Sequence, residues 1–341
     1  MFAVVDCGTT NTRVFIVKDD GRIVASGSKK VGVRDTSITG SRDALRNGVT
    51  ELFFQVLEEN SIADGNIAFA IASGMITSEI GLIEIPHLVA PVGLKELAGG
   101  IVKVDDPAVL PIRRPVYFVR GVRNNYPDNA EVKDLRIIDF MRGEEVQCMG
   151  VLADPATPTP CSIVALSSHT KVMYIDSERR IVASNTTLSG QFYEALVGST
   201  NIGKSLTPTQ GEQAGGYSYE QLVAAAMECV EHAGLGRTLV MPRFMQVLLK
   251  SNSHERNVFV NAAIASDDLK AFSEMRNQGF AGNHYIFYGN RERCELYEYL
   301  LKKTFGADLS ISCIHDPEEV GMLTVRGAIF VAADILQSHK Q

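Results

Sequence analysis

The first segment whose residues could bind phosphate lies near the N-terminus and reads Asp6-Cys7-Gly8-Thr9-Thr10-Asn11-Thr12-Arg13. This segment lies between two apolar runs, and a tight turn there would present backbone N–H groups and hydroxyls that bind anionic oxygens. Gly8 permits a backbone to approach a phosphate closely, and Asp6 is placed to hold a hydrated Mg2+. A plain β-turn uses the same residue types, so both interpretations stay open. The chain contains no G-x-x-x-x-G-K-[ST] loop, which excludes a P-loop.

Two adjacent carboxylates stand in Met141-Arg142-Gly143-Glu144-Glu145-Val146-Gln147, at the start of a helix predicted for residues 143–152. Acidic residues at a helix N-terminus gain from the helix dipole, which is one explanation for the pair. The other is a general base that orients a substrate hydroxyl for in-line attack on a γ-phosphate. Successive helical residues point about 100° apart, so only one of the two need face a substrate. The residues do not say which one.

Three weaker segments follow in the second half of the chain. In Ser167-Ser168-His169-Thr170-Lys171, His169 could hydrogen-bond a phosphate or substrate and Lys171 could neutralise its charge. Ser189-Gly190 and Tyr288-Gly289-Asn290 each precede a helical pattern, and Gly289 could let an adenine or ribose pack on the backbone. A simple helix N-terminus is the plain alternative for both.

The elements that position these residues repeat in the two halves. A strand, a polar turn and two further strands open each half, and the proline-rich residues 154–160 separate them. We predict an α/β protein with two lobes, 1–153 and 161–341, a nucleotide site between them, and a last helix that could return to the first lobe. The predicted strands are 2–6, 13–18, 22–26, 66–72, 162–166, 171–176, 181–184, 284–289 and 309–314; the helices are 43–59, 143–152, several in 219–276, 291–304 and 318–337, and 95–135 is irregular.

Composition narrows the class of protein. Of 341 residues, 45% are hydrophobic and 21% charged, typical of a globular chain, and the net charge is −7. No basic stripe favours nucleic acid, and no apolar run reaches the ~18 residues of a membrane helix. The N-terminus lacks the features of a signal peptide, so we expect a cytoplasmic protein. The six cysteines are scattered without a C-x-x-C pair, which makes a cysteine-built zinc site an unfavoured interpretation.

Taken together, the segments resemble the 2-dehydro-3-deoxygalactonokinase family, which has the two-lobed actin-like ATPase, or ribonuclease H-like, fold of sugar kinases. Matching stretches run from residue 6 to about residue 327. They are the Asp6–Arg13 segment, Ser73-Gly74-Met75-Ile76-Thr77-Ser78-Glu79-Ile80-Gly81, the Met-Arg-Gly-Glu-Glu stretch, the region of His169 and Lys171, Ser189-Gly190 and Tyr288-Gly289. The Met-Arg-Gly-Glu-Glu stretch is the most specific of these, and the first turn is shared by the whole superfold.

The resemblance implies ATP- and Mg2+-dependent phosphorylation of the 6-hydroxyl of a 2-keto-3-deoxy sugar acid in galactonate breakdown. It implies Asp6 as the Mg2+ ligand and Glu144 or Glu145 as the base, with Arg142 facing the sugar carboxylate. It implies two further sets. The phosphate and nucleotide set is Gly8, Thr9, Thr10, Asn11, Arg13, Ser167, Ser168, His169, Lys171, Gly289 and Asn290, and the substrate set is Gly74, Met75, Ser78, Arg142, Ser189 and Gly190.

The chain departs from the family in three places. Pro-Gly-Thr-His is Leu166-Ser167-Ser168-His169 here, Thr-Gly-Glu-Leu is Leu188-Ser189-Gly190-Gln191, and Gly-Thr-Ser is Gly289-Asn290-Arg291. Two alternatives therefore stay open beside the kinase: a non-catalytic sensor of sugar acid or nucleotide, and an exopolyphosphatase-like phosphohydrolase. For partners we expect the sugar acid and ATP, no nucleic acid and no membrane, with a homodimer as the default oligomer.

Overall fold

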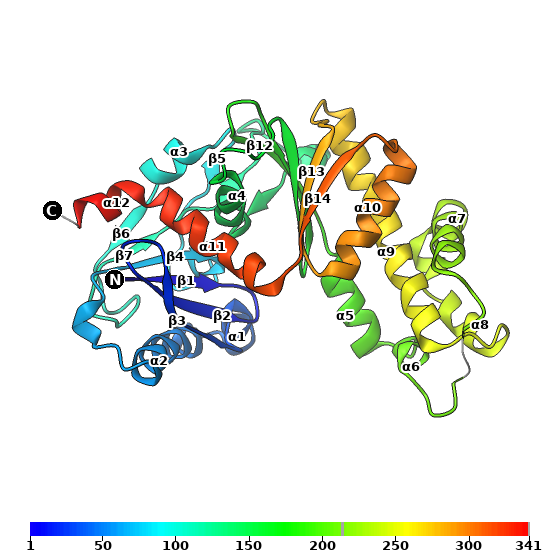
Figure 1. Ribbon diagram of the computed structural model, residues 1–341, viewed down its shortest axis with the longest axis horizontal. Helices are drawn as coiled ribbons and strands as arrows, with labels where there is room; N and C mark the ends of the chain where they lie inside the picture. The colour runs from blue at the N-terminus through cyan, green and yellow to red at the C-terminus, as the bar shows by residue number, and fades with distance from the viewer. Residues whose placement is uncertain (213–214, 340–341) are drawn as a thin grey trace. The chain divides into compact units, whose positions relative to one another are not determined.

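The computed structural model describes residues 1–212 and 215–339, and the chain forms two compact units (Figure 1). The first unit comprises residues 1–160, 175–184 and the residues from 318 onward. The second comprises residues 161–174 and 185–317. Within the described residues, no helix has the length and apolar character needed to cross a membrane.

The first unit is built around a six-stranded sheet of order β3-β2-β1-β4-β7-β6. Its central strand β1 (Phe2–Cys7) pairs antiparallel with β2 (Thr12–Val17) and parallel with β4 (Ala70–Gly74). An almost continuous apolar run suits a strand that is covered on both faces, and β1 is buried along nearly its whole length. The sheet is completed by β3 (Ile23–Lys29), β7 (Val116–Phe118) and β6 (Val102–Val104).

Helices cover both faces of this sheet. Helix α2 (Asp43–Glu59) has the predicted bounds, and its buried stripe, which includes Leu45, Val49, Leu52 and Val56, joins the core beneath the sheet. Figure 1 shows α11 (Pro317–Val331), in red, on the opposite side of the sheet from α2.

Helix α4 (Glu144–Leu152) crosses α11 at two glycines. A Cβ added to Gly150 would lie 2.0 Å from the carbonyl oxygen of Leu323, and one on Gly327 would lie 1.8 Å from that of Val146. The two helix backbones therefore touch, and no larger residue fits at either glycine. The crossing fixes the helix that begins with the acidic pair.

Another sheet has five strands in the order β12-β11-β10-β13-β14, and most of its residues belong to the second unit. Strand β13 (His284–Gly289) lies between β10 (Cys161–Leu166) and β14 (Ser310–Ile314) and is parallel to both. The other strands are β11 (Thr170–Ile175) and β12 (Ile181–Thr187).

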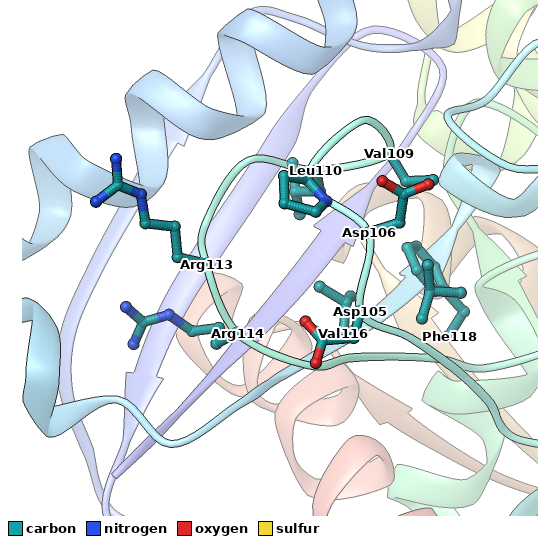
Figure 2. Close-up of a pocket in the computed structure, with 10 residues that line it drawn as sticks. Asp105, Asp106, Val109, Leu110, Arg113, Arg114, Val116 and Phe118 are labelled. Atoms are coloured by element: carbon teal, nitrogen blue, oxygen red, sulfur yellow. The ribbon is translucent and has the colours of Figure 1, made fainter.

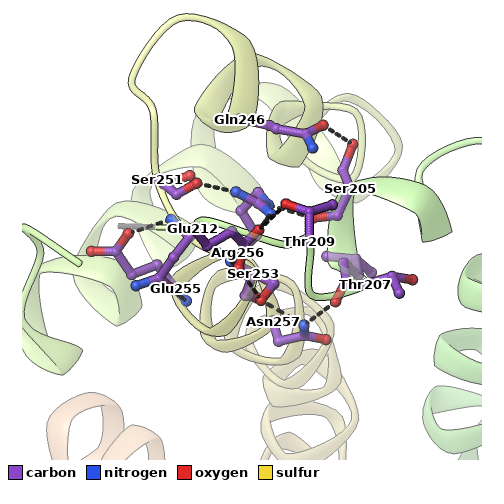
Figure 3. Close-up of polar contacts among 12 residues, drawn as sticks. Ser205, Thr207, Thr209, Glu212, Gln246, Ser251, Ser253, Glu255, Arg256 and Asn257 are labelled. Carbon is purple, nitrogen blue, oxygen red and sulfur yellow. Dashed lines mark hydrogen bonds and ion pairs between the residues drawn. The ribbon is translucent and has the colours of Figure 1, made fainter. Parts of the chain in front are cut away.

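Helix α9 (Ser253–Asn277) is the buried centre of the second unit's helical part. Its Arg256, 1% exposed, donates to the carbonyls of Ser205 and Ser251 and pairs with Glu212 at 2.7 Å (Figure 3). Each of the three nitrogens of this guanidinium group donates to an acceptor, so the segments around α9 are tied together by one buried cation. The surrounding helices are α5 (Ser189–Ser199), α6 (Gly203–Leu206), α7 (Tyr219–Thr238), α8 (Met241–Val247) and α10 (Arg291–Phe305).

The mixed sheets with flanking helices confirm the predicted α/β fold class, but three local predictions were wrong. Residues 95–135 are not simply irregular, because β6 and β7 lie there; strands of three residues are too short to show a two-residue period. The predicted strand 66–72 begins only at Ala70, after a 3-10 turn at Asp64–Asn66. The predicted helix 318–337 is interrupted at Ala332, between α11 and α12 (Ala333–Ser338).

The remaining elements of the first unit are short. They are α1 (Val33–Thr39), α3 (Leu94–Gly99), β5 (Leu88–Val89), β8 (Val122–Arg123), β9 (Phe140–Met141) and the 3-10 turns Met75–Thr77 and Val132–Ile137.

Candidate active site

The first hydroxyl-rich turn joins β1 to β2 and is held from behind. The amide of Gly8 donates to the Asn11 carbonyl at 2.8 Å, and the carbonyl of Thr9 accepts from the Arg34 amide at 2.9 Å. A Cβ on Gly32 would lie 2.4 Å from the Thr9 carbonyl oxygen, so this support requires glycine. Gly8, Thr9 and Thr10 are half-buried and Asn11 is exposed. The turn is therefore rigid on one side and accessible on the other, as a phosphate-binding turn must be.

Asp6 and Arg13 face each other across this hairpin. They are cross-strand partners, and the guanidinium Nη2 of Arg13 lies 2.6 Å from the Asp6 carboxylate. Arg13 thus positions Asp6, while 38% of the Arg13 side chain remains exposed. The parallel partner of Asp6 on β4 is Ser73, whose buried hydroxyl has no hydrogen-bond partner among the described residues. A buried polar atom without a partner costs free energy, which favours a water or ligand beside Asp6.

The Gly74 loop begins directly beside the turn. Gly74 has φ +86°, and a Cβ there would lie 2.4 Å from the carbonyl oxygen of Cys7. Gly143 has φ +113°, and its Cβ would lie 3.3 Å from the Cα of Gly74. Three segments that are far apart in sequence, the first turn, the Gly74 loop and the start of α4, therefore meet at the end of β1 and β4. Both glycines have a positive φ, which glycine adopts readily and other residues avoid, so both positions favour glycine.

The predicted sugar-acid residues lie along this loop. Met75 is half-buried, and the buried Ser78 donates its hydroxyl to the Met75 carbonyl at 2.8 Å. Arg142 is directed at the same loop: it donates to the hydroxyl of Thr77 and to the carbonyl of Ile85, both at 2.8 Å. Burial lowers the pKa of the Arg142 guanidinium, with Glu145 the largest opposing charge. Arg142 therefore holds the loop in place, and Thr77 is a residue of the site that the sequence interpretation did not single out.

The structure distinguishes the two carboxylates of α4. Glu145 is fully buried, and both of its oxygens accept from the amide of Gly143, at 2.9 and 2.8 Å. Burial, followed by the charge of Glu144, raises the pKa of Glu145 to about 8. Burial therefore favours the neutral form of Glu145, and its hydrogen bonds with Gly143 brace the turn. Glu144 is the first residue of the helix and is half-buried, so its carboxylate remains accessible to a substrate.

The donor set fits Mg2+ only in the form bound to a nucleotide. No group of three or more His, Cys, Asp or Glu side chains able to hold a metal occurs in residues 1–212 and 215–339. An ion held mostly by water and phosphate oxygens needs just one or two carboxylates, and Asp6 supplies one at the end of β1.

The second hydroxyl-rich turn, in the second unit, joins β10 to β11. The amide of Ser167 donates to the His169 carbonyl at 3.1 Å, and the hydroxyl of Ser168 lies 3.3 Å from Nδ1 of His169. Ser167 and Ser168 are exposed and His169 is half-buried. Gly190, at the start of α5, packs against this turn, because a Cβ on it would lie 2.3 Å from the Ser167 carbonyl oxygen. The turn and the Gly190 segment therefore form one surface.

The late segment also reaches this surface. Gly289 has φ +145°, and its Cβ would lie 2.4 Å from the Leu166 carbonyl oxygen, one residue before the turn. Asn290 is the N-cap of α10, and its side chain accepts from the amide of Arg293 at 3.3 Å. Gly289 brings β13 against the second turn, and Asn290 fixes the helix that follows.

Two predicted residues are directed inward. Lys171 is buried and donates to the hydroxyl of Thr186 at 2.6 Å. The hydroxyl of Ser189, also buried, donates to the carboxylate of Asp268 on α9. The structure thus shows positioning contacts at both residues. Asp268 and its second donor, Tyr297, had no sequence signal beyond a helical position.

A small pocket lies elsewhere in the first unit, where the loop between β6 and β7 folds beside the sheet (Figure 2). Asp105, Asp106 and Arg113 are on its rim, and Arg114 is committed to the Asp64 carboxylate and the Ile67 carbonyl. No predicted site residue lines it. The chemistry of the turns, and not this cavity, locates the candidate site.

Two known proteins are similar to this chain over most of its length. A protein of Rhizobium meliloti (strain 1021), named "Probable 2-dehydro-3-deoxygalactonokinase", is 22% identical over 235 residues, which is 67% of this chain and 66%, just under two thirds, of the relative. A crystal structure from Sinorhizobium meliloti, provisionally assigned as a 2-dehydro-3-deoxygalactonokinase, superposes with a TM-score of 0.72 at 19% identity, covering 98% of this chain and 99% of that one.

A more distant structure, a reductive activator for a corrinoid, iron-sulfur protein, has a TM-score of 0.52 at 11% identity and covers 99% of this chain and 62% of that one. These likenesses show that the chain shares its fold with these two proteins. The model of the 2-keto-3-deoxy-galactonokinase family matches residues 6–323, and the chain therefore belongs to that family.

Proposed function

We propose that the protein transfers the γ-phosphate of Mg·ATP to the 6-hydroxyl of a 2-keto-3-deoxy sugar acid, with 2-dehydro-3-deoxygalactonate as the first candidate, in galactonate breakdown. One observation supports this above the others. The phosphate-type turn, the Gly74 loop and the acidic start of α4 meet at one end of the first unit's sheet, at the contact of Gly143 with Gly74. A nucleotide-side group and an acceptor-side group are thereby brought within one rigid framework.

Each group has a role in this proposal. Asp6, which is positioned by Arg13, contacts the hydrated Mg2+ of the Mg·ATP substrate. The amides and hydroxyls of residues 8–10 bind the phosphates of ATP. The Gly74–Ser78 loop, braced by Arg142, holds the sugar acid. The Arg142 side chain is half-buried, and the exposed part of its guanidinium is the charge that recognises the sugar carboxylate.

Glu144 is the general base of this proposal. It is the accessible member of the pair, whereas Glu145 is buried, has its pKa raised to about 8 and is committed to Gly143. A base that orients a hydroxyl contributes about 10²–10⁴-fold to the rate. Glu144→Gln should therefore reduce kcat by roughly that factor and leave Mg·ATP binding intact. Glu145→Gln, the matched control on the same helix, should keep kcat within a few-fold.

The decisive assay is ADP release from Mg·ATP across a panel of 2-keto-3-deoxy sugar acids, with an acceptor-free blank. Release that depends on one acid supports the kinase and names its substrate. Equal release in the blank would instead identify a phosphohydrolase. Binding of an acid or nucleotide without turnover would identify a sensor, in which case the Glu144 variant would behave as the wild type.

A further inference from the structure

The second hydroxyl-rich turn is held by an arginine that lies outside it. Arg293, in the first turn of α10, donates from Nη1 to the Ser167 carbonyl at 2.5 Å and from Nη2 to the Thr170 hydroxyl at 2.9 Å. These two acceptors stand at the beginning and just after the end of the turn. The guanidinium lies 5.7 Å from the centre of the Tyr297 ring, which fixes its plane. The Arg293 side chain therefore connects the two ends of the turn.

The acceptors of Arg293 are themselves fixed from below. The Thr170 hydroxyl lies 3.1 Å from the hydroxyl of Tyr297, which donates to the buried carboxylate of Asp268. Ser189 donates to the same carboxylate, and Ser189 begins the helix whose Gly190 packs on the turn. Arg293 is thus the solvent-side end of a hydrogen-bond chain that crosses the unit to the α5 segment.

The charge of Arg293 is not neutralised by these contacts. Both acceptors are uncharged, and no carboxylate of the described chain lies within ion-pair distance of its guanidinium. A half-buried cation without a counter-ion is costly, and its position in the first turn of a helix gains nothing from the helix dipole. Arg291, two residues earlier, is exposed, and its side chain makes no hydrogen bond or ion pair with the described residues, so the contacts of Arg293 are specific to its position.

We propose that Arg293 is the positioning residue of the second phosphate turn. It sets the turn through the Ser167 carbonyl and the Thr170 hydroxyl, and its remaining charge favours the terminal phosphates of the nucleotide. The inference rests on the proposed function in one respect, that the nucleotide is Mg·ATP. It adds to that function a residue that orders the nucleotide side without touching the sugar acid.

The test compares Arg293→Met and Arg293→Lys with Arg291→Met, the matched control that removes the same charge from the same helix. Affinity is measured by calorimetric titration with Mg2+ and a non-hydrolysable ATP analogue, which needs no acceptor. Loss of two charged hydrogen bonds predicts affinity at least about tenfold weaker in Arg293→Met. In turnover, KM for ATP should rise by a similar factor, while KM for the sugar acid stays unchanged and kcat changes less. Arg293→Lys should recover part of the affinity, and Arg291→Met should match the wild type.

Affinity of Arg293→Met within twofold of the wild type, or an equal loss in Arg291→Met, overturns the inference. Thr170→Val removes one acceptor of Arg293 and keeps the cation, so it provides the test if Arg293→Met fails to fold. It should weaken nucleotide affinity several-fold. Wild-type affinity in Thr170→Val would count against the positioning role of Arg293. Failure to phosphorylate any acid would refute the proposed function alone, because the titration decides the role of Arg293 separately.

Discussion

Replacement of Glu145 by Gln would remove a buried titration from the protein while keeping the shape of the side chain. The Glu145 carboxyl is fully buried and accepts from the Gly143 amide with both oxygens. Burial raises its pKa from 4.5 to about 8, and this effect outweighs the opposing hydrogen bonds and the charge of Arg142. A glutamine retains a carbonyl oxygen for the Gly143 amide and has no charge to bury.

The sign of the effect follows from proton linkage. Between pH 4.5 and pH 8 the folded wild type binds more protons than the unfolded chain, so the free energy of unfolding falls as pH rises. The stability that comes from the protonated carboxyl is complete below pH 4.5 and is lost by about pH 8. At about 1.4 kcal/mol per pH unit, the loss between pH 5.5 and pH 8.5 amounts to roughly 3 kcal/mol. Glu145→Gln lacks this pH-dependent loss of stability.

Urea unfolding of the wild type and Glu145→Gln at pH 5.5 and pH 8.5 measures the term directly, because other titrating groups are common to both proteins. The free energy of unfolding of the variant minus that of the wild type should increase by about 3 kcal/mol between the two pH values. An unchanged difference would refute the reasoning: Glu145 would then be ionised in the fold, and its exclusion as the base would lose its physical ground.

Three further outcomes are expected. Gly74→Ala should lower the free energy of unfolding by about 1–3 kcal/mol, because φ is +86° and a Cβ would lie 2.4 Å from the Cys7 carbonyl oxygen. Asp6→Asn should raise the Mg2+ concentration for half-maximal turnover by roughly tenfold, through loss of a charged contact. Arg256→Met should lower the free energy of unfolding by about 3–5 kcal/mol, because it leaves the buried carbonyls of Ser205 and Ser251 without their donors.

Each of these has a control in the same chain. Gly99→Ala adds a Cβ that meets nothing within 4 Å and should leave stability unchanged or slightly higher. Asp20→Asn changes a carboxylate of the exposed hairpin and should not alter the Mg2+ titration. Arg243→Met removes an exposed side chain that donates to Gln246, and should cost under about 1 kcal/mol. A variant and control that behave alike would refute the corresponding explanation.

The sequence predicted those features that depend on local pattern. The apolar run of residues 2–6 became β1, and the periodic apolar positions of residues 43–59 became α2 with the expected bounds. The family was predicted from motifs and is confirmed by the match over residues 6–323, and the α/β fold class is confirmed by the mixed sheets with their flanking helices. The roles assigned to individual site residues stay predictions until the assays above are done.

The features that the sequence did not predict depend on contacts between distant segments. Adjacent Glu144 and Glu145 have identical local patterns, and only burial separates them. The local sequence does not distinguish Arg293 from other charged residues of a surface helix, because its partners Ser167 and Thr170 lie more than 120 positions earlier. Strands of three residues are too short to show a periodic pattern. One of them, β7, forms by pairing with the edge of β4.

The glycine crossing of α4 with α11 has a consequence for biosynthesis. The ribosome makes Gly150 well before Gly327, and the whole second unit is translated in between. Until α11 emerges, the backbone of α4 lacks the surface it packs on, and the start of that helix, with Glu144, lacks its final support. The first unit therefore completes its packing only after the second unit has been synthesised, which makes the candidate site a late product of translation.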